Sequence, residues 1–239
     1  MITLPIVALP GTLLDSRSLA ALLQGHAARS HVLGEERTLD HEVDRLAAQA
    51  NGPSVWLGHS LGGIVALHLA LRHPSQVSAL VLLGANARAG RDSSEARRAA
   101  QWALAQRDGL GALARSKLAP GYGLMPGLDT DDDMLASLAA QAQSVGLQRF
   151  EHQLAYARQR PGLLAPRHRL SCPVLALSGG LDTLCPPAHS EEIVALVEPP
   201  TRAEHHCLAG AGHLFPMQQP GWAAHKVATF LAFLTESTA

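Results

Sequence analysis

Short apolar runs alternate with longer amphipathic stretches along most of the chain. The apolar runs predict strands at Ile2–Leu9, His31–Gly34, Pro53–Leu57, Val77–Leu83, Val174–Ser178 and Ala203–Leu208. The amphipathic stretches between them predict helices at Ser16–Ala28, Asp40–Ala50, Leu61–His73, Pro187–Val197 and Trp222–Thr235. Continuous apolar runs are typical of strands covered on both faces. We therefore predict an α/β architecture in which helices flank a mostly parallel sheet of about six strands.

One block interrupts this alternation. From about Ala85 to Ser171 the sequence has helical patterns alone, at Ser93–Arg107, Leu110–Leu118, Asp131–Val145 and Leu147–Arg160. We interpret residues 1–85 and 172–239 as one core domain and residues 86–171 as a helical lid (cap) inserted into it. Ligands of open α/β sheets bind at the carboxyl ends of the strands, so we expect the lid to roof a site there.

Composition narrows the classes of protein that this chain can be. Its 239 residues suffice for one domain with a full core, and 47% hydrophobic with 16% charged residues is typical of a soluble globular protein. A net charge of −1 gives no reason to expect a nucleic-acid or membrane partner. With two lysines among its 19 basic residues, the arginine- and alanine-rich chain fits a GC-rich bacterial genome.

The lack of a recognisable targeting signal and the spacing of the cysteines both favour a cytoplasmic location. The apolar start MITLPIVALPGTLL lacks a basic segment and contains Pro5 and Pro10, so it predicts a strand and not a signal peptide. No apolar run is long enough to span a bilayer. The three cysteines lack C-x-x-C spacing, which argues against a disulfide framework and a zinc site. We expect a cytoplasmic protein without metal or cofactor.

The stretch VWLGHSLGGIVAL, residues 55–67, joins a predicted strand to a predicted helix through a glycine-rich turn. A phosphate-binding loop would need a lysine near this turn or the G-x-G-x-x-G pattern, and both are absent here. Gly58, Ser60 and Gly62 instead form G-x-S-x-G, in which small flanking residues allow a nucleophilic serine to occupy a strained, exposed turn. An isolated match of this kind is weak evidence, so the prediction depends on finding a base and an acid elsewhere in the chain.

Two later loops supply them. Asp182 lies in LSGGLDTLCPP directly after a predicted strand, and His213 lies in LAGAGHLFPMQQP after the last one. The order Ser60, Asp182, His213 and the motifs around each residue resemble the α/β-hydrolase superfamily. The resemblance extends over essentially the whole chain and implies a serine hydrolase in which His213 activates Ser60 and Asp182 orients His213.

The resemblance also implies an oxyanion hole. Leu61 begins the helix after Ser60, so its free N–H is one expected donor. The second is expected from ALPGTLLDS, where relatives usually carry His-Gly and this chain has Pro10-Gly11. Thr12 is the favoured donor and Leu13 the next, because proline has no N–H. There is no room before residue 9 for the superfamily's usual N-terminal hairpin, and the chain is similar to lidded bacterial carboxylesterase-like members.

The substrate is less well defined by the sequence. Candidate pocket residues, which could equally form the core of the lid, are Leu13, Trp102, Met125, Met134, Phe150, Tyr156 and Leu214. Residues 86–171 carry 12 Lys/Arg and 8 Asp/Glu, so a basic lid is able to attract anionic acyl groups unless these arginines are paired within the protein.

We predict hydrolysis of small-molecule carboxylic esters. Thioester or carrier-linked acyl ester hydrolysis, cofactor-free haloperoxidase chemistry and a non-catalytic ligand-binding protein remain alternatives. Ile64 replaces the arginine that typically follows the elbow in menaquinone-pathway lyases and argues against that role. The sequence does not define the oligomeric state.

Overall fold

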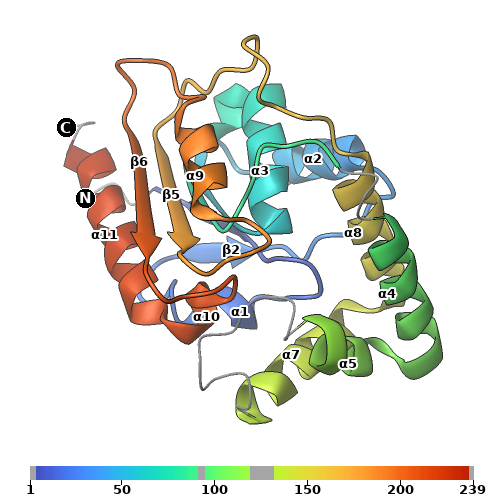
Figure 1. The fold of residues 1–239 in the computed structure, drawn as a ribbon. Coiled ribbons are helices and arrows are strands. Elements are labelled where there is room, and N and C mark those ends of the chain that lie inside the picture. The colour runs from blue at the N-terminus through green and yellow to red at the C-terminus, as the bar shows by residue number, and fades with distance from the viewer. Residues whose placement is uncertain (1–3, 91–94, 119–131, 237–239) are drawn as a thin grey trace.

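A six-stranded parallel sheet forms the centre of the protein (Figure 1). The computed structural model describes residues 4–90, 95–118 and 132–236. The strand order is β2-β1-β3-β4-β5-β6, and every neighbouring pair is parallel. The strands are β1 (Ile6–Leu9), β2 (Ala28–Ser30), β3 (Ser54–His59), β4 (Val77–Leu83), β5 (Val174–Gly179) and β6 (Ala203–Leu208). The predicted fold class and strand number are confirmed.

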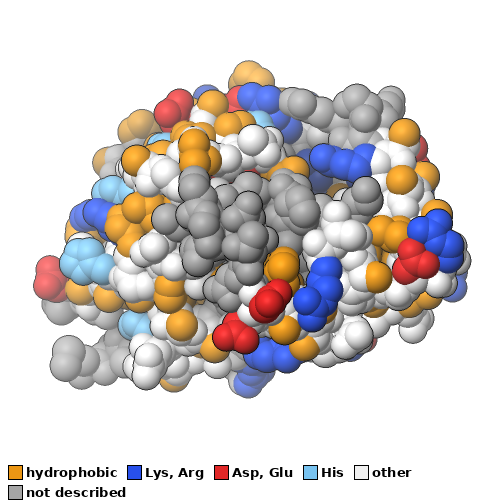
Figure 2. Space-filling view, turned by 60° about the horizontal axis from the view of Figure 1, so that its bottom comes forward, with side chains coloured by type: hydrophobic (Ala, Val, Ile, Leu, Met, Phe, Trp, Pro, Cys, Tyr) orange, Lys and Arg blue, Asp and Glu red, His pale blue; other side chains and the backbone are white. Residues whose placement is uncertain are grey.

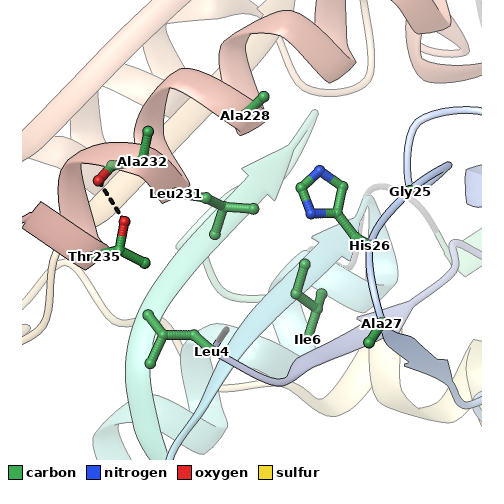
Figure 3. Close-up of a pocket in the computed structure, with 9 residues that line it drawn as sticks. All are labelled: Leu4, Ile6, Gly25, His26, Ala27, Ala228, Leu231, Ala232 and Thr235. Carbon is green, nitrogen blue, oxygen red and sulfur yellow. Dashed lines mark hydrogen bonds between the residues drawn. The ribbon is translucent and has the colours of Figure 1, made fainter. Parts of the chain in front are cut away.

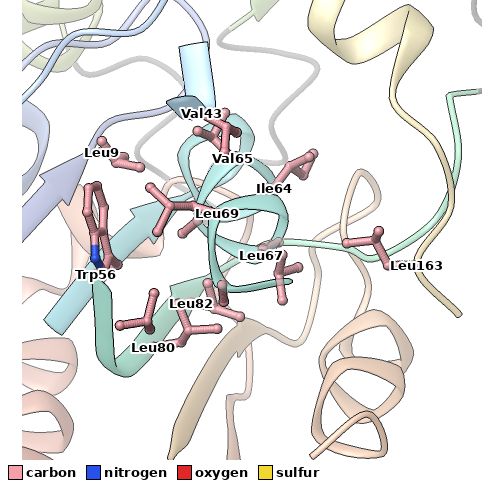
Figure 4. Packing of buried hydrophobic residues seen from close by; sticks show 14 of the residues in the cluster. Leu9, Val43, Trp56, Ile64, Val65, Leu67, Leu69, Leu80, Leu82 and Leu163 are labelled. Carbon is pink, nitrogen blue, oxygen red and sulfur yellow. The ribbon is translucent and has the colours of Figure 1, made fainter. Parts of the chain in front are cut away.

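Helices cover both faces of the sheet because successive strand residues point to opposite sides. Val7 and Leu9 pack in one apolar cluster, and Ile6 and Ala8 pack in another. The first cluster is covered by α2 (Leu39–Gln49), α3 (Leu61–Arg72) and α9 (Pro187–Val194), and Figure 4 shows α3 side chains against β3 and β4. The second is covered by α1 (Arg17–Ala20), α10 (Phe215–Gln218) and α11 (Pro220–Glu236). A 3-10 turn, η1 (Pro74–Gln76), leads into β4.

Helices make up most of the described part of the segment between β4 and β5, which we call the helical insert (residues 86–171). It contains α4 (Glu95–Asp108), α5 (Leu110–Leu113), the π-helical turn η3 (Ala114–Leu118), α7 (Asp132–Val145) and α8 (Leu147–Gln159). These helices gather to the right of the sheet in Figure 1. The two segments that connect the helical insert to the core are hydrogen-bonded to each other. Leu163 N donates to Ala87 O at 2.8 Å, and Gly90 N donates to Arg160 O at 3.0 Å.

Two predicted elements near the N-terminus were wrong. The edge strand is Ala28–Ser30 and not His31–Gly34, because the apolar side chains of Val32 and Leu33 pack under helices after the strand has ended. The helix expected at Ser16–Ala28 ends at Ala20 and continues as irregular turns. Gly25, with φ +84°, lies in this segment, which must reach the sheet edge by Ala28.

Over the described ranges, no helix is both long enough and apolar enough to cross a membrane.

Candidate active site

The turn between β3 and α3 holds Ser60 in a strained conformation. Its φ of +53° is in the left-handed region, which few non-glycine residues adopt. Ser60 N donates to Leu83 O at 2.9 Å, which joins the turn to the end of the neighbouring strand β4. A Cβ on Gly58 would lie 2.4 Å from the Gly62 carbonyl carbon, and one on Gly62 would lie 1.9 Å from Leu9 O. Strand, turn and helix therefore pack closely enough to require both glycines.

Ser60, His213 and Asp182 form a continuous hydrogen-bonded chain. His213 Nε2 lies 2.8 Å from Ser60 Oγ, and His213 Nδ1 lies 2.7 Å from Asp182 Oδ2. Asp182 Oδ1 accepts the backbone N–H groups of Leu184 and Cys185, both at 2.8 Å. The His213 and Asp182 side chains are buried, whereas Ser60 is partly exposed. The three residues predicted from separate motifs therefore lie together, with the serine at the accessible end.

The protonation of this chain follows from its surroundings. Burial raises the pKa of Asp182, but the hydrogen bond and charge of His213 and the two backbone donors outweigh it, so the pKa lies below its usual value. An ionised Asp182 only accepts hydrogen bonds, so His213 Nδ1 carries the proton and its Nε2 accepts from the Ser60 hydroxyl. Gly84, with φ +54°, allows the backbone to approach this pair, because a Cβ there would lie 3.3 Å from Asp182 Oδ2.

His59 supports His213 from behind the turn. Its Nε2 lies 3.0 Å from the His213 carbonyl oxygen, which can only accept, so Nε2 is protonated. Complete burial lowers the pKa of His59 to about 3, with the charge of His213 acting in the same direction. His59 is therefore neutral at physiological pH and orients the His213 backbone.

The loop after β1, residues 11–15, lies directly against the serine. A Cβ on Gly11 would be 3.2 Å from Ser60 Cβ, so Thr12 follows the point of closest approach. Thr12 is partly exposed while its loop neighbours are buried, and its N–H makes no hydrogen bond within the described residues. The Leu13 N–H instead donates to Gln153 Oε1 at 2.9 Å. Leu13 is thus unavailable as an oxyanion donor, and Thr12 and Leu61 remain the candidates.

Most of the predicted pocket residues belong to one apolar cluster. Leu13, Phe150 and Leu214 are buried there, with Trp102 and Met134 packed against them. This cluster joins the helical insert to the loop after β1 and to the residue following His213.

Two of the predicted pocket residues, Tyr156 and Met125, are not among the residues of this cluster. Tyr156 packs in a different cluster, with the helices α2 and α3, and its hydroxyl donates to the Glu36 carbonyl. The structure therefore does not bring it to the site, because its ring faces the core and not the serine. Met125 lies outside the described residues.

Several residues around the site were missed by the sequence patterns. Gln153 and Gln141 are fully buried in α8 and α7 and bind the backbone of Leu13 and Asp15. The available signal was the polar Gln153 between Phe150 and Tyr156, at a spacing of three on the buried side of α8.

In the loop that carries Asp182, Cys185 Sγ lies 3.4 Å from Asn86 Nδ2. Burial raises the pKa of the Cys185 thiol to about 12, so this thiol is not a reactive nucleophile.

Away from the serine, we considered one cavity and possible metal-binding groups. A mainly apolar cavity of about 220 Å³ lies between α11 and the start of β1, at the opposite end of this strand from the serine (Figure 3). It is lined by Leu4, Ile6, Gly25, His26, Ala27, Ala228, Leu231, Ala232 and Thr235. Within the described residues, no three His, Cys, Asp or Glu side chains are grouped so that they could hold a metal ion.

Comparison with known proteins agrees with this fold. The parallel sheet, the strained serine turn and the insert after β4 define an α/β hydrolase. Residues 37–219 match the family described as "Serine aminopeptidase, S33", and the chain belongs to this family.

Two relatives have names that state an activity. Lipase LipV of Mycobacterium tuberculosis is 45% identical over 89 residues, covering 35% of this chain and 33% of the relative. A pimeloyl-[acyl-carrier protein] methyl ester esterase of Neisseria meningitidis is 30% identical over 151 residues, covering 62% of this chain and 58% of the relative. The matches thus span between a third and about three fifths of these relatives' lengths.

Solved structures share the fold over nearly the whole chain. A thermophilic esterase from Thermogutta terrifontis has a TM-score of 0.81 at 23% identity, covering 97% of this chain and 90% of that one. The enol-lactonase from Burkholderia xenovorans has a TM-score of 0.79 at 19% identity, covering 97% and 92%. At these identities the likeness establishes the fold alone.

Proposed function

We propose that this protein is a serine esterase that cleaves small carboxylic esters through an acyl-enzyme on Ser60. Ser60 Oγ attacks the ester carbonyl carbon while His213 Nε2 takes the hydroxyl proton. The tetrahedral intermediate collapses, and His213 returns the proton to the departing alcohol. Water, activated by the same imidazole, then attacks the acyl-enzyme and releases the carboxylic acid and free Ser60. Asp182 stays ionised and stabilises the imidazolium in both steps.

The hydrogen-bonded chain from Asp182 through His213 to a partly exposed Ser60 is the observation that carries this proposal. The backbone N–H groups of Thr12 and Leu61 would bind the developing oxyanion, since Leu61 is the first residue of α3 and has no intrahelical acceptor. The apolar cluster between the insert and the loop after β1 supports an apolar acyl group as the substrate. In this proposal the insert acts as a lid over the strand ends.

A carrier-linked acyl ester is the second candidate substrate. It is favoured by the Neisseria meningitidis relative, whose name specifies an acyl-carrier-protein ester, and by the excess of basic residues in the insert. The charge argument is reduced by pairing, because Arg107, Arg149 and Arg158 each form an ion pair with a carboxylate. On the face in Figure 2, several basic side chains likewise lie beside acidic ones. We therefore place the simple ester first.

Turnover of a series of p-nitrophenyl esters tests the proposal. We expect measurable hydrolysis, with Ser60→Ala reducing kcat by about 10⁴-fold or more. The matched control is Ser171→Ala, because this serine is exposed and outside the site, and its activity should equal that of the wild type. A folded wild-type protein that hydrolyses no ester or thioester would instead favour a non-catalytic ligand-binding role.

A further inference from the structure

A buried amide in the helical insert connects two loops of the core. Gln153 of α8 is fully buried, its Oε1 accepts the Leu13 N–H at 2.9 Å, and its Nε2 donates to Leu33 O at 2.8 Å. A reversed amide would place its NH₂ against an N–H and its oxygen against a carbonyl, so the two partners fix one orientation. A buried polar group that is satisfied on both sides is held rigidly.

The loop that this amide holds is the one facing the nucleophile. Leu13 has a φ of +57°, a conformation that a leucine seldom adopts without external contacts. The hydrogen bond to Gln153 occupies the Leu13 N–H, while Gly11 lies against Ser60 and Thr12 stays partly exposed. The Thr12 N–H belongs to the peptide directly before that of Leu13, so holding the Leu13 peptide limits how far the Thr12 N–H can turn.

Further contacts join the same two parts of the molecule. In α7, buried Gln141 Oε1 accepts the Asp15 N–H at 3.2 Å, and Ser144 Oγ donates to Asp15 Oδ2 at 2.6 Å. In α8, His152 Nδ1 donates to Gly34 O at 2.9 Å. The loop after β1 is thus held from the insert side, and α8 is itself anchored to the core.

We propose that Gln153 is a positioning residue for the oxyanion hole, holding the loop after β1 so that the Thr12 N–H points to the carbonyl oxygen of the substrate. This inference rests on the proposed esterase function. Gln153 does not touch the substrate in this account and acts through the Leu13 peptide. Its loss should therefore reduce kcat far more than it changes KM, because the oxyanion forms only after substrate has bound.

Two substitutions and one control test this role with p-nitrophenyl esters. Gln153→Leu keeps the size of the side chain but loses both hydrogen bonds. We expect kcat to fall about 10- to 100-fold with KM within about twofold, the scale of a misplaced catalytic group. Gln148→Ala, an exposed position on the same helix, should match the wild type in both constants.

Gln153→Glu adds a readout that a purely structural role would not move. A protonated glutamic acid reproduces both hydrogen bonds, whereas its carboxylate faces the Leu33 carbonyl without a donor. Burial keeps such an acid protonated to higher pH than usual. The ratio of this variant's kcat to that of the wild type should therefore approach one at low pH and fall about tenfold or more as pH rises.

The outcomes separate this inference from the proposed function. A wild type without turnover overturns both. An active wild type, together with a folded Gln153→Leu variant of unchanged kcat, overturns the positioning role alone. Should the leucine variant fail to fold, the glutamate variant decides, since a kcat ratio independent of pH would contradict the role.

Discussion

Replacing Gly62 with alanine is expected to disrupt both stability and catalysis. The added Cβ would lie 1.9 Å from Leu9 O and 2.6 Å from Leu9 C, whereas real Cβ atoms keep at least 3.0 Å. Helix α3 and strand β1 would therefore have to separate by about 1.1 Å, and the atoms in the way are backbone. Overpacking typically costs ~1–3 kcal/mol, and we expect a free energy of unfolding lowered by about 3 kcal/mol or more.

The same displacement would reach the chemistry. Leu9 and Pro10 lead directly into Gly11, which lies against Ser60, so the Thr12 N–H would move with them. A misplacement of about 1 Å can cost about 100-fold in rate. We expect kcat to fall on that scale in whatever fraction of the variant folds.

Thermal denaturation and ester turnover measure the two effects. For a chain of this size, about 3 kcal/mol corresponds to a melting temperature lowered by roughly 6–12 °C. The control is Gly221→Ala in α11, where a Cβ would meet nothing within 4 Å and helix propensity should stabilise the protein by up to ~1 kcal/mol. If Gly62→Ala melts at or above the wild-type temperature, the close packing around the serine turn described above is refuted.

Two further predictions concern titratable groups. Asp182→Asn should leave the protein folded by circular dichroism but lower kcat about 10⁴-fold, because an amide cannot hold His213 in the required tautomer; a loss under tenfold would contradict its role. For His59, the folded pKa of about 3 lies below the unfolded value near 6.5, so the unfolded state binds the extra proton as pH falls below 6.5. This group should lower the free energy of unfolding by up to ~1.4 kcal/mol per pH unit from 6.5 towards 3. Urea titrations of His59→Gln should give a shallower slope over that window, and an unchanged slope would show that His59 is not buried in its neutral form.

The sequence indicated the parts of the fold that hydrophobic periodicity controls. The buried strands β3, β4 and β5 are continuous apolar runs, so their positions follow from the need to cover both faces of a sheet. The edge strand β2 has no such pattern, because two of its three residues are exposed and backbone pairing with β1 alone defines it. Its position could not be found from side chains.

Some residues of the site could be predicted from local sequence motifs, and others could not. Ser60, Asp182 and His213 are marked by local glycine and proline contexts in their own loops. The role of Gln153 depends on a contact 140 residues away with Leu13, which no local pattern encodes. That Leu13, the second candidate donor, is already hydrogen-bonded elsewhere, which leaves Thr12 as the favoured donor in this loop, is visible only once that contact is known.

The most direct test of the proposed mechanism is covalent labelling by a fluorophosphonate probe, followed by intact-mass measurement and peptide mapping. The account predicts one adduct per chain, located on Ser60, no adduct in Ser60→Ala, and undiminished labelling in Ser171→Ala. A folded wild-type protein that takes up no probe, or one whose adduct maps to another residue, would contradict the claim that Ser60 is the activated nucleophile.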